Sequence, residues 1–335
     1  MPDFSIGVDL GGTNLRIAAV SRDGHLLEKV ALEANAARGP DPVIDEMCSA
    51  IQRINRQYEQ NGKFLGAGIG IPGIIDLETG TIRKSANLPL FSDYPVRAEI
   101  ERRLGAKVFL DNDGNFAALG EKWLGAGRSV SNMAILTLGT GIGGGIVLNG
   151  KIFQGMTGMS GEFGHVPISQ DGPPCGCGSY GCAEQYASAT AIMRMAREAI
   201  AAGSPGLAQA ADSAVEFNSE AIYKLAIKGD KDAQEIFRKF GKALGFVLAG
   251  AVNILNLEMF VIGGGVSSAW DAFAPSMFEE LRSRSLVYAA TDPGDLPLER
   301  THGKTIIAKA LLGSDAGLFG AARVPIVEIE TRLSS

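Results

Sequence analysis

Short apolar runs and polar turns alternate at the start of the chain. Residues 4–8, 15–20 and 26–32 are rich in Ile, Val and Leu, a composition that favours β-strands. The turns between them contain Gly11-Gly12 and Asp23-Gly24, and the second dipeptide is typical of hairpins. The pattern therefore predicts three strands joined by tight turns.

The apolar spacing changes to a helical period after Asp41. An Asp followed by Pro42 favours the start of a helix, with the Asp side chain as its cap, and Gly62 favours its end. The apolar face of this helix consists of Ile44, Met47, Cys48, Ile51 and Tyr58. We therefore expect Cys48 to be a small residue of the core. Further along we expect strands at 65–71 and 108–110, a hairpin around 78–80, and helices at 96–104 and 115–124.

The initial pattern returns in the middle of the chain. Residues 134–138, 146–148 and 151–153 are strand-like, and Gly139-Thr140-Gly141 lies between the first two. Leu10-Gly11-Gly12-Thr13 occupies the corresponding place near the N-terminus. We interpret this as an internal duplication, in which each of two sheets carries a glycine turn between its first two strands.

The last part of the chain is mostly helical. We expect helices at 185–202, 220–228, 230–255, 269–284 and 315–323, and strands at 258–262 and 305–308. Residues 203–218 are interpreted as a surface connection without an assigned function. Strands and helices in this order favour α/β domains with helices packed on central sheets. We expect a small domain over 1–113, completed by a C-terminal helix at 314–335, and a large domain over 114–313.

Composition and charge narrow the class of protein. A chain of 335 residues with 46% hydrophobic and 20% charged residues is expected to form two well-packed domains. Its net charge of −6 disfavours nucleic acid as the main partner, since phosphate binding requires a basic surface. The most apolar stretch, residues 246–266, contains Asn253, Asn256 and Glu258, which disfavours a membrane span. Without a secretory signal at its start, the chain is expected to be cytoplasmic.

Residues 158–188 concentrate the candidate metal chemistry. Cys175, Cys177 and Cys182 lie within eight residues of one another, and His165 lies ten residues upstream. Three thiolates and one imidazole form a complete tetrahedral set for structural Zn²⁺. The alternative is a cluster of unligated thiols. Prolines and glycines in this stretch disfavour a long helix or strand, so a bound metal would supply the order that regular hydrogen bonding does not.

Two glycine turns are candidates for phosphate binding. Asp9-Leu10-Gly11-Gly12-Thr13-Asn14 follows a strand; its glycines let backbone N–H groups approach phosphate, and Asp9 can hold Mg²⁺ through water. Gly139-Thr140-Gly141 begins a GxGxxG pattern, but a strand follows it, whereas a dinucleotide fingerprint requires a helix. Two such turns fit a nucleoside triphosphate held between two domains. A plain hairpin turn is the alternative for each.

Three further groups have both a functional and a structural interpretation. Gly263-Gly264-Gly265, between a strand and a helix, suits either contact with adenosine or a tight packing bend. Asp111-Asn112-Asp113 ends a strand, where repulsion between two carboxylates would raise one pKa and create a base, or where Asp113 would only cap a helix. Glu162, His165 and Glu184 suit sugar hydroxyls, although a glutamate in the first turn of a helix is an equal explanation for Glu184.

Five motifs, in order, resemble the ROK family of sugar kinases and repressors. They are DLGGTN at 9–14, DND at 111–113, GTGIGGG at 139–145, GEFGH at 161–165 and CGCGSYGCAE at 175–184. The resemblance covers nearly the whole chain and points to the bacterial glucokinases within the family. It implies an actin-like ATPase (ribonuclease H-like) fold, with two α/β domains around a central cleft, and a homodimer or a dimer of dimers.

The resemblance also implies roles for individual residues. Asp113 would be the general base that takes the proton from the sugar 6-hydroxyl as it attacks the γ-phosphate of ATP. The sugar would be held by Asn87, Asn112, Asp113, Glu162, His165 and Glu184. ATP and Mg²⁺ would be held by Asp9, Gly11, Gly12, Thr13, Asn14, Gly139, Thr140, Gly141, Gly264 and Gly265. Structural Zn²⁺ would be held by His165, Cys175, Cys177 and Cys182.

The function implied is an ATP-dependent hexose kinase of carbohydrate metabolism and glycolysis, with glucose as the expected substrate. Kinases for N-acetylglucosamine, N-acetylmannosamine, mannose, allose or fructose are alternatives, because the motifs do not identify the side chains around C2 and C4. A sugar-sensing regulator is a further alternative; regulators of the family carry a DNA-binding module before the first phosphate motif, and eight residues precede Asp9 here. The family often has Glu where this chain has Asp111, so contact of that carboxylate with substrate stays open.

Overall fold

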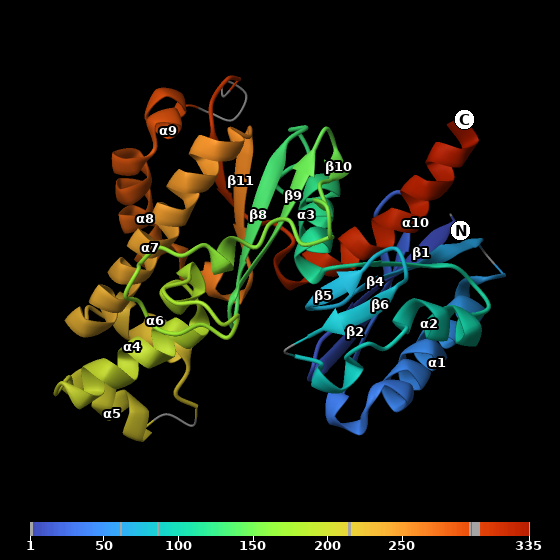
Figure 1. The fold of residues 1–335 in the computed structure, drawn as a ribbon, viewed down its shortest axis with the longest axis horizontal. Helices are drawn as coiled ribbons and strands as arrows, with labels where there is room; N and C mark the ends of the chain where they lie inside the picture. Colours follow the sequence, from blue (N-terminus) through green and yellow to red (C-terminus); the bar gives the residue numbers. More distant parts are fainter. Residues whose placement is uncertain are drawn as a thin grey trace. The chain divides into compact units, whose positions relative to one another are not determined.

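A five-stranded sheet in the order β3-β2-β1-β4-β7 organises the N-terminal part of the chain (Figure 1). The computed structural model describes residues 3–60, 62–85, 87–213, 216–294, 296 and 302–334. The strands of this sheet are β1 (Phe4–Leu10), β2 (Asn14–Ser21), β3 (Leu26–Glu33), β4 (Phe64–Gly70) and β7 (Val108–Asp111). The first three pair antiparallel, as tight hairpins require, whereas β4 and β7 extend the sheet in parallel.

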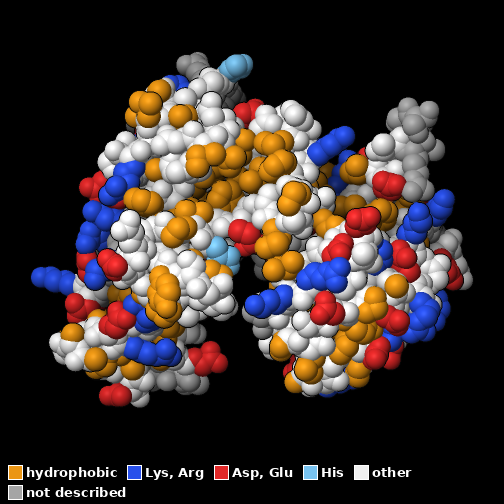
Figure 2. Space-filling model, in the orientation of Figure 1, with side chains coloured by type: hydrophobic (Ala, Val, Ile, Leu, Met, Phe, Trp, Pro, Cys, Tyr) orange, Lys and Arg blue, Asp and Glu red, His pale blue; other side chains and the backbone are white. Residues whose placement is uncertain are grey.

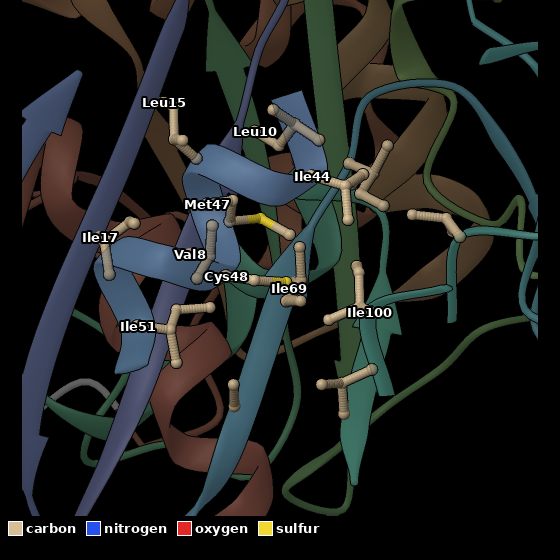
Figure 3. Close-up of a cluster of buried hydrophobic side chains, with 14 of the residues drawn as sticks. Val8, Leu10, Leu15, Ile17, Ile44, Met47, Cys48, Ile51, Ile69 and Ile100 are labelled. Carbon is tan, nitrogen blue, oxygen red and sulfur yellow. The ribbon is translucent and has the colours of Figure 1, made fainter. Parts of the chain in front are cut away.

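The apolar side of α1 (Pro40–Tyr58) covers one face of this sheet. Figure 3 shows Val8 of β1 beside Met47 and Cys48 of the helix. Cys48 is 3% exposed, and burial raises the pKa of its thiol to about 11, which confirms that it is a core residue. The predicted cap at Asp41 is wrong: the helix begins one residue earlier, at a proline whose fixed φ favours the first turn, and has no side-chain cap.

The helix α10 (Ala316–Ser334) packs on the other side of β1, where small residues alternate with the large ones. The Oγ of Ser5 donates a hydrogen bond of 2.5 Å to the backbone oxygen of Ala322. A β-carbon on Gly7 would lie 2.0 Å from the backbone oxygen of Leu318. The small residues therefore let the helix backbone lie directly on the sheet, and so the last helix completes the N-terminal part of the fold.

The chain divides into two units. The first contains residues 1–131, 145–161 and 311–335, and the second contains residues 132–144 and 162–310. The helix α3 (Asp113–Trp123) belongs to the first unit and packs on α10 through glycine: a β-carbon on Gly120 would lie 2.0 Å from the backbone oxygen of Ala316. The chain therefore first leaves this unit after Ser131, whereas the sequence suggested a boundary after Asp113.

The second five-stranded sheet has the order β10-β9-β8-β11-β12, which repeats the order of the first sheet position by position. Its strands are β8 (Met133–Leu138), β9 (Ile142–Leu148), β10 (Lys151–Ile152), β11 (Met259–Gly263) and β12 (Ile306–Lys309). The strand β11 pairs in parallel with β8 and β12, as β4 does with β1 and β7. The predicted internal duplication is confirmed.

The other elements largely follow the predicted pattern. They are β5 (Ile74–Asp76), β6 (Thr81–Lys84), α2 (Val96–Leu104), α4 (Ala189–Ala201), α5 (Pro205–Ser213), α6 (Ser219–Ile227), α7 (Lys231–Leu255), α8 (Trp270–Arg284) and α9 (Leu286–Thr291). The interpretation of residues 203–218 as a surface connection is wrong, because α5 lies there and its Leu207 is fully buried. No helix among the described residues is both long and apolar enough to span a membrane. Figure 2 shows acidic and basic side chains interspersed on the face that it displays.

Candidate active site

The first glycine turn connects β1 and β2 in the first unit. The backbone N–H of Gly11 donates to the oxygen of Asn14 at 2.8 Å, which closes the turn. A β-carbon on Gly12 would lie 2.4 Å from the backbone oxygen of Asn87, so only glycine allows these two segments to meet. Thr13 and Asn14 are exposed. The structure thus brings the predicted phosphate turn and the predicted sugar residue Asn87 together.

Asp9, the predicted Mg²⁺ residue, forms an ion pair with Arg16 across the hairpin. The two residues are direct partners in the antiparallel register, and Arg16 Nε donates to Oδ2 of Asp9 at 3.1 Å. Arg16 Nη1 also donates to the backbone oxygen of Ser314 at 2.8 Å. The Asp9 side chain stays partly exposed, so its carboxylate can still serve a hard cation, which prefers oxygen ligands.

The second glycine turn connects β8 and β9 in the second unit. Gly139 N donates to the oxygen of Gly141 at 2.9 Å, and the oxygen of Gly139 accepts from the N–H of Ala189 at 2.8 Å. The oxygen of Thr140 accepts from Thr190 Oγ1 at 2.8 Å. Both contacts come from the first turn of α4, so that helix fixes the shape of the turn. A strand follows, which confirms that the motif is not a dinucleotide fingerprint.

The glycines after β11 have different surroundings. Gly264 has a φ of 81°, and a β-carbon on it would lie 2.4 Å from the backbone oxygen of Leu138. This position therefore is a packing bend against the end of β8, immediately before Gly139. A β-carbon on Gly265 would have nothing within 4 Å, so this glycine is open on its side-chain side. Of the two interpretations, packing explains Gly264, and Gly265 is the one available to a ligand.

The Asp111-Asn112-Asp113 motif spans the end of β7 and the start of α3. Asn112 is the N-cap of the helix, because its side chain accepts a hydrogen bond of 2.7 Å from Gly114 N. Asp113 is the first helical residue and is exposed, so the alternative in which Asp113 is only the helix cap is wrong. The raised pKa belongs to Asp111, and its main cause is burial, whereas the sequence had suggested repulsion between the two carboxylates.

The cysteine loop of the second unit brings the four predicted zinc ligands together. One ligand atom from each of His165, Cys175, Cys177 and Cys182 lies within 4.8 Å of all the others. Cys177 Sγ and Cys182 Sγ are 3.7 Å apart, and Cys175 Sγ lies 3.6 Å from His165 Nδ1. Zinc–sulfur bonds of about 2.3 Å in a tetrahedron place the sulfurs about 3.8 Å apart. The donor set and its spacing therefore fit Zn²⁺.

The same loop has more backbone order than its composition suggests. Isolated β-bridges join Pro167 to Cys182 and Pro174 to Tyr180. Gly181 N donates to the oxygen of Pro173 at 2.9 Å. Backbone hydrogen bonds therefore hold the same short segment that contains the candidate metal ligands.

Three predicted sugar residues converge beside this loop. His165 Nε2 lies 3.9 Å from Glu162 Oε2, and His165 Nδ1 lies 3.8 Å from Glu184 Oε1. Cys175 Sγ donates to Glu184 Oε1 at 3.0 Å. Glu184 lies in a short 3-10 helix ahead of α4, which begins only at Ala189, so the first turn of a long helix does not explain this glutamate. The Glu162 side chain is 43% exposed, and partial desolvation raises its pKa.

The sequence profile of the ROK family matches residues 5–326. The chain belongs to the ROK family. The glucokinase of Thermotoga maritima is 38% identical over 320 residues, which cover 95% of this chain and 96% of that protein. The xylose repressor of Caldicellulosiruptor bescii is 29% identical over 283 residues, which cover 84% of this chain and 71% of the repressor.

Solved ROK structures share the fold. The structure of a ROK family glucokinase from Streptomyces griseus in complex with glucose and AMPPNP has a TM-score of 0.78 and 30% identity, and the match covers 96% of this chain and 98% of that chain. Together with the duplicated strand order, this similarity confirms the actin-like ATPase fold of two α/β units.

Several polar residues of this ROK chain were not predicted from the sequence. Arg16 could have been found, because a hairpin of known register places it opposite Asp9. Gln154 donates to Asp111 at 2.7 Å, and Glu121 is buried. The sequence pattern does not mark either residue, because their partners are distant in the chain.

Proposed function

We propose that this chain is an ATP-dependent hexose kinase that transfers the γ-phosphoryl group of ATP to the 6-hydroxyl of glucose. The observation that carries the proposal is the exposed carboxylate of Asp113 on the first residue of α3, directly after a parallel strand. The 38% identity with the Thermotoga maritima glucokinase supports the same activity. The Streptomyces griseus glucokinase with glucose and AMPPNP supports the pair of substrates.

Asp113 acts as the general base in the proposed reaction. Its carboxylate accepts the proton of the 6-hydroxyl while that oxygen forms a bond to the γ-phosphorus, and the bond from phosphorus to the β–γ bridging oxygen breaks to release ADP. A positioned base contributes about 10²–10⁴-fold to such a step. Asn112, which is fixed as the helix cap, and Asn87 are the proposed sugar contacts of the first unit.

The two glycine turns are the proposed phosphate sites. Phosphoryl transfer depends mostly on positioning and charge neutralisation, for which backbone N–H groups are suited. The residues proposed are Gly11, Gly12, Thr13, Asn14, Gly139, Thr140 and Gly141, with Gly265 on the adenosine side, next to the packing bend at Gly264. Mg²⁺, when bound, neutralises phosphate charge, and Asp9 is the carboxylate proposed to hold it.

Glu162, His165 and Glu184 are the proposed sugar residues of the second unit. Structural Zn²⁺, when bound, supplies cross-links between His165, Cys175, Cys177 and Cys182. We propose that His165 has two roles, since Nδ1 faces Cys175 Sγ at 3.6 Å while Nε2 faces Glu162. The loop then presents both glutamates to one sugar.

An ADP-release assay with Mg-ATP and a panel of sugars tests the proposal. We expect the highest kcat/KM for glucose over N-acetylglucosamine, N-acetylmannosamine, mannose, allose and fructose. A higher kcat/KM for another hexose would assign a different sugar to the same reaction. No ADP with any sugar, together with sugar binding in calorimetry, would instead favour the regulator class to which the xylose repressor belongs. A homodimer in the cytoplasm with a role in glycolysis is part of the proposal, and light scattering measures the oligomeric state.

A further inference from the structure

The carboxylate of Asp111 has three hydrogen-bond donors inside the first unit. Its side chain lies at the end of β7 and the residue is 3% exposed. Oδ1 accepts from the backbone N–H of Asn112 at 2.8 Å and from Nδ2 of Asn115 at 2.7 Å. Oδ2 accepts from Nε2 of Gln154 at 2.7 Å. A carboxylate buried and bonded in this way is not a sugar ligand, so it needs another role.

The donors belong to two segments that matter for the proposed reaction. Asn112 and Asn115 lie in the turn and the first turn of helix around Asp113. Gln154 lies in the loop after β10, which is closed by a hydrogen bond of 3.3 Å from Ser160 N to the oxygen of Gln154. This loop runs to the residue before Glu162. One carboxylate thus joins the segment of the base to the segment that leads to a sugar residue.

Asn115 has no other anchor for its side chain among the described residues. The residue is 1% exposed, and its Oδ1 has no hydrogen-bond partner within the described ranges. A buried amide with one unpaired atom costs free energy, so the bond to Asp111 has to hold its orientation. The bond to Asp111 therefore orients the Asn115 side chain and links the first turn of α3 to the end of β7.

We propose that Asp111 and Gln154 are positioning residues that together fix the turn of Asp113 and the loop leading to Glu162. The proposal rests on the hexose kinase function proposed above. Neither side chain touches the reacting atoms. They set the distance and the orientation between two segments that the proposed reaction needs in fixed positions. A displacement of about 1 Å in such a site can lower the rate by about 10²-fold.

In this pair Gln154 donates and Asp111 accepts, and exchanging these roles gives a specific test. Gln154 is an exposed residue whose amide reaches the buried carboxylate. Gln154→Glu removes the donor to Oδ2 of Asp111, because two carboxylates repel each other. We expect kcat to fall by about tenfold or more, with the KM for ATP within about twofold of the original value, because the proposed phosphate turns are unchanged. Asp111→Asn is expected to stay within about threefold, since the Gln154 amide can rotate and present its oxygen.

The double variant Asp111→Asn/Gln154→Glu restores a donor opposite an acceptor. The amide at position 111 donates to the carboxylate at position 154 and still accepts from Asn112 and Asn115. We expect kcat to return to within about threefold of the original chain. Met156→Glu is the matched control, because it adds the same charge to the same loop at a residue that is 98% exposed, and we expect it to be neutral.

Hydrogen exchange separates this inference from the proposed function. We expect Gln154→Glu to increase amide exchange in residues 111–117 and 153–161, and the double variant to reverse the increase, whether or not the protein phosphorylates a sugar. Restored exchange without kinase activity in the original chain would reject the proposed function and keep the pairing. If kcat and exchange of Gln154→Glu equal those of Met156→Glu, or if the double variant rescues neither, the positioning role is wrong.

Discussion

A β-carbon on Gly141 would lie 2.5 Å from Oε2 of Glu184. The second glycine turn and a proposed sugar residue therefore touch within the second unit, and glycine is what makes the contact possible. The turn takes its shape from α4, whereas the glutamate takes its position from the cysteine loop. Changes on one side of this contact should therefore be measurable on the other.

Gly141→Ala should displace the Glu184 carboxylate and weaken sugar binding. We expect the KM for sugar to rise by about tenfold, because a charge-assisted hydrogen bond is lost or lengthened. A tenfold change corresponds to a free energy of about 1.4 kcal/mol. Gly139→Ala is the matched variant, since its β-carbon would meet nothing within 4 Å in the described part of the chain. It should change the KM for ATP and leave the KM for sugar alone. Equal effects of the two variants on sugar would contradict the contact.

Asp113→Asn should remove the base and keep the fold. An amide oxygen at this position can still accept from Gly114 N, which Asp113 Oδ1 does at 2.9 Å, so the melting temperature should stay close to that of the original chain. The rate of sugar phosphorylation should fall by about 10²–10⁴-fold. Asp23→Asn, at an exposed hairpin turn, is the control and should be fully active. Near-normal turnover of Asp113→Asn would reject the base.

Cys177→Ser should release zinc and disorder the loop of Glu162 and Glu184. Elemental analysis should give one zinc per original chain and a clear loss in the variant, with a higher KM for sugar as the indirect result. Cys48→Ala removes a thiol from the core of the first unit and should keep its zinc. A zinc-free preparation with unchanged sugar affinity would show that the metal does not order the site.

Glu121→Gln should destabilise the first unit. The residue is 0% exposed, and its carboxylate accepts from the N–H groups of Ala126, Leu311 and Leu312. An amide replaces one acceptor by a donor that faces those N–H groups, which should lower the free energy of unfolding by about 1–3 kcal/mol. Glu59→Gln, at an exposed helix end, should change it by less than about 0.5 kcal/mol. Urea unfolding measures both, and equal values would contradict the buried clamp.

Local chemistry could be predicted because it lies in neighbouring residues. The candidate zinc set consists of three cysteines within eight residues and a histidine ten residues upstream, and the structure brings them together. The glycine turns at 11–12 and 139–141 likewise follow from strands on both sides. Resemblance to the ROK family added the proposed base Asp113 and the proposed sugar residues, which spacing alone left open.

The errors of prediction came from positions with two local solutions. Asn and Asp are both favourable N-cap residues. In the structure Asn112 is the cap, and Asp113 is the first residue of the helix. The segment around α5 is rich in alanine and serine, a composition that also suits a surface loop. The burial of Leu207 in the structure shows that the segment packs as a helix. For α5, packing of Leu207 decided between conformations that the local sequence permits.

The sequence by itself determined most of the elements, the two glycine turns, the candidate zinc ligands and the repetition of the fold, because hydrophobic period and turn chemistry act within a few residues. Only the tertiary structure decided which residues meet across the chain. Gly12 meets Asn87, Gly141 meets Glu184, and Asp111 meets Gln154. Such pairs depend on strand order and on close backbone approach. A local sequence pattern does not specify either of these. The candidate site was therefore predicted residue by residue, whereas its internal support became visible only in three dimensions.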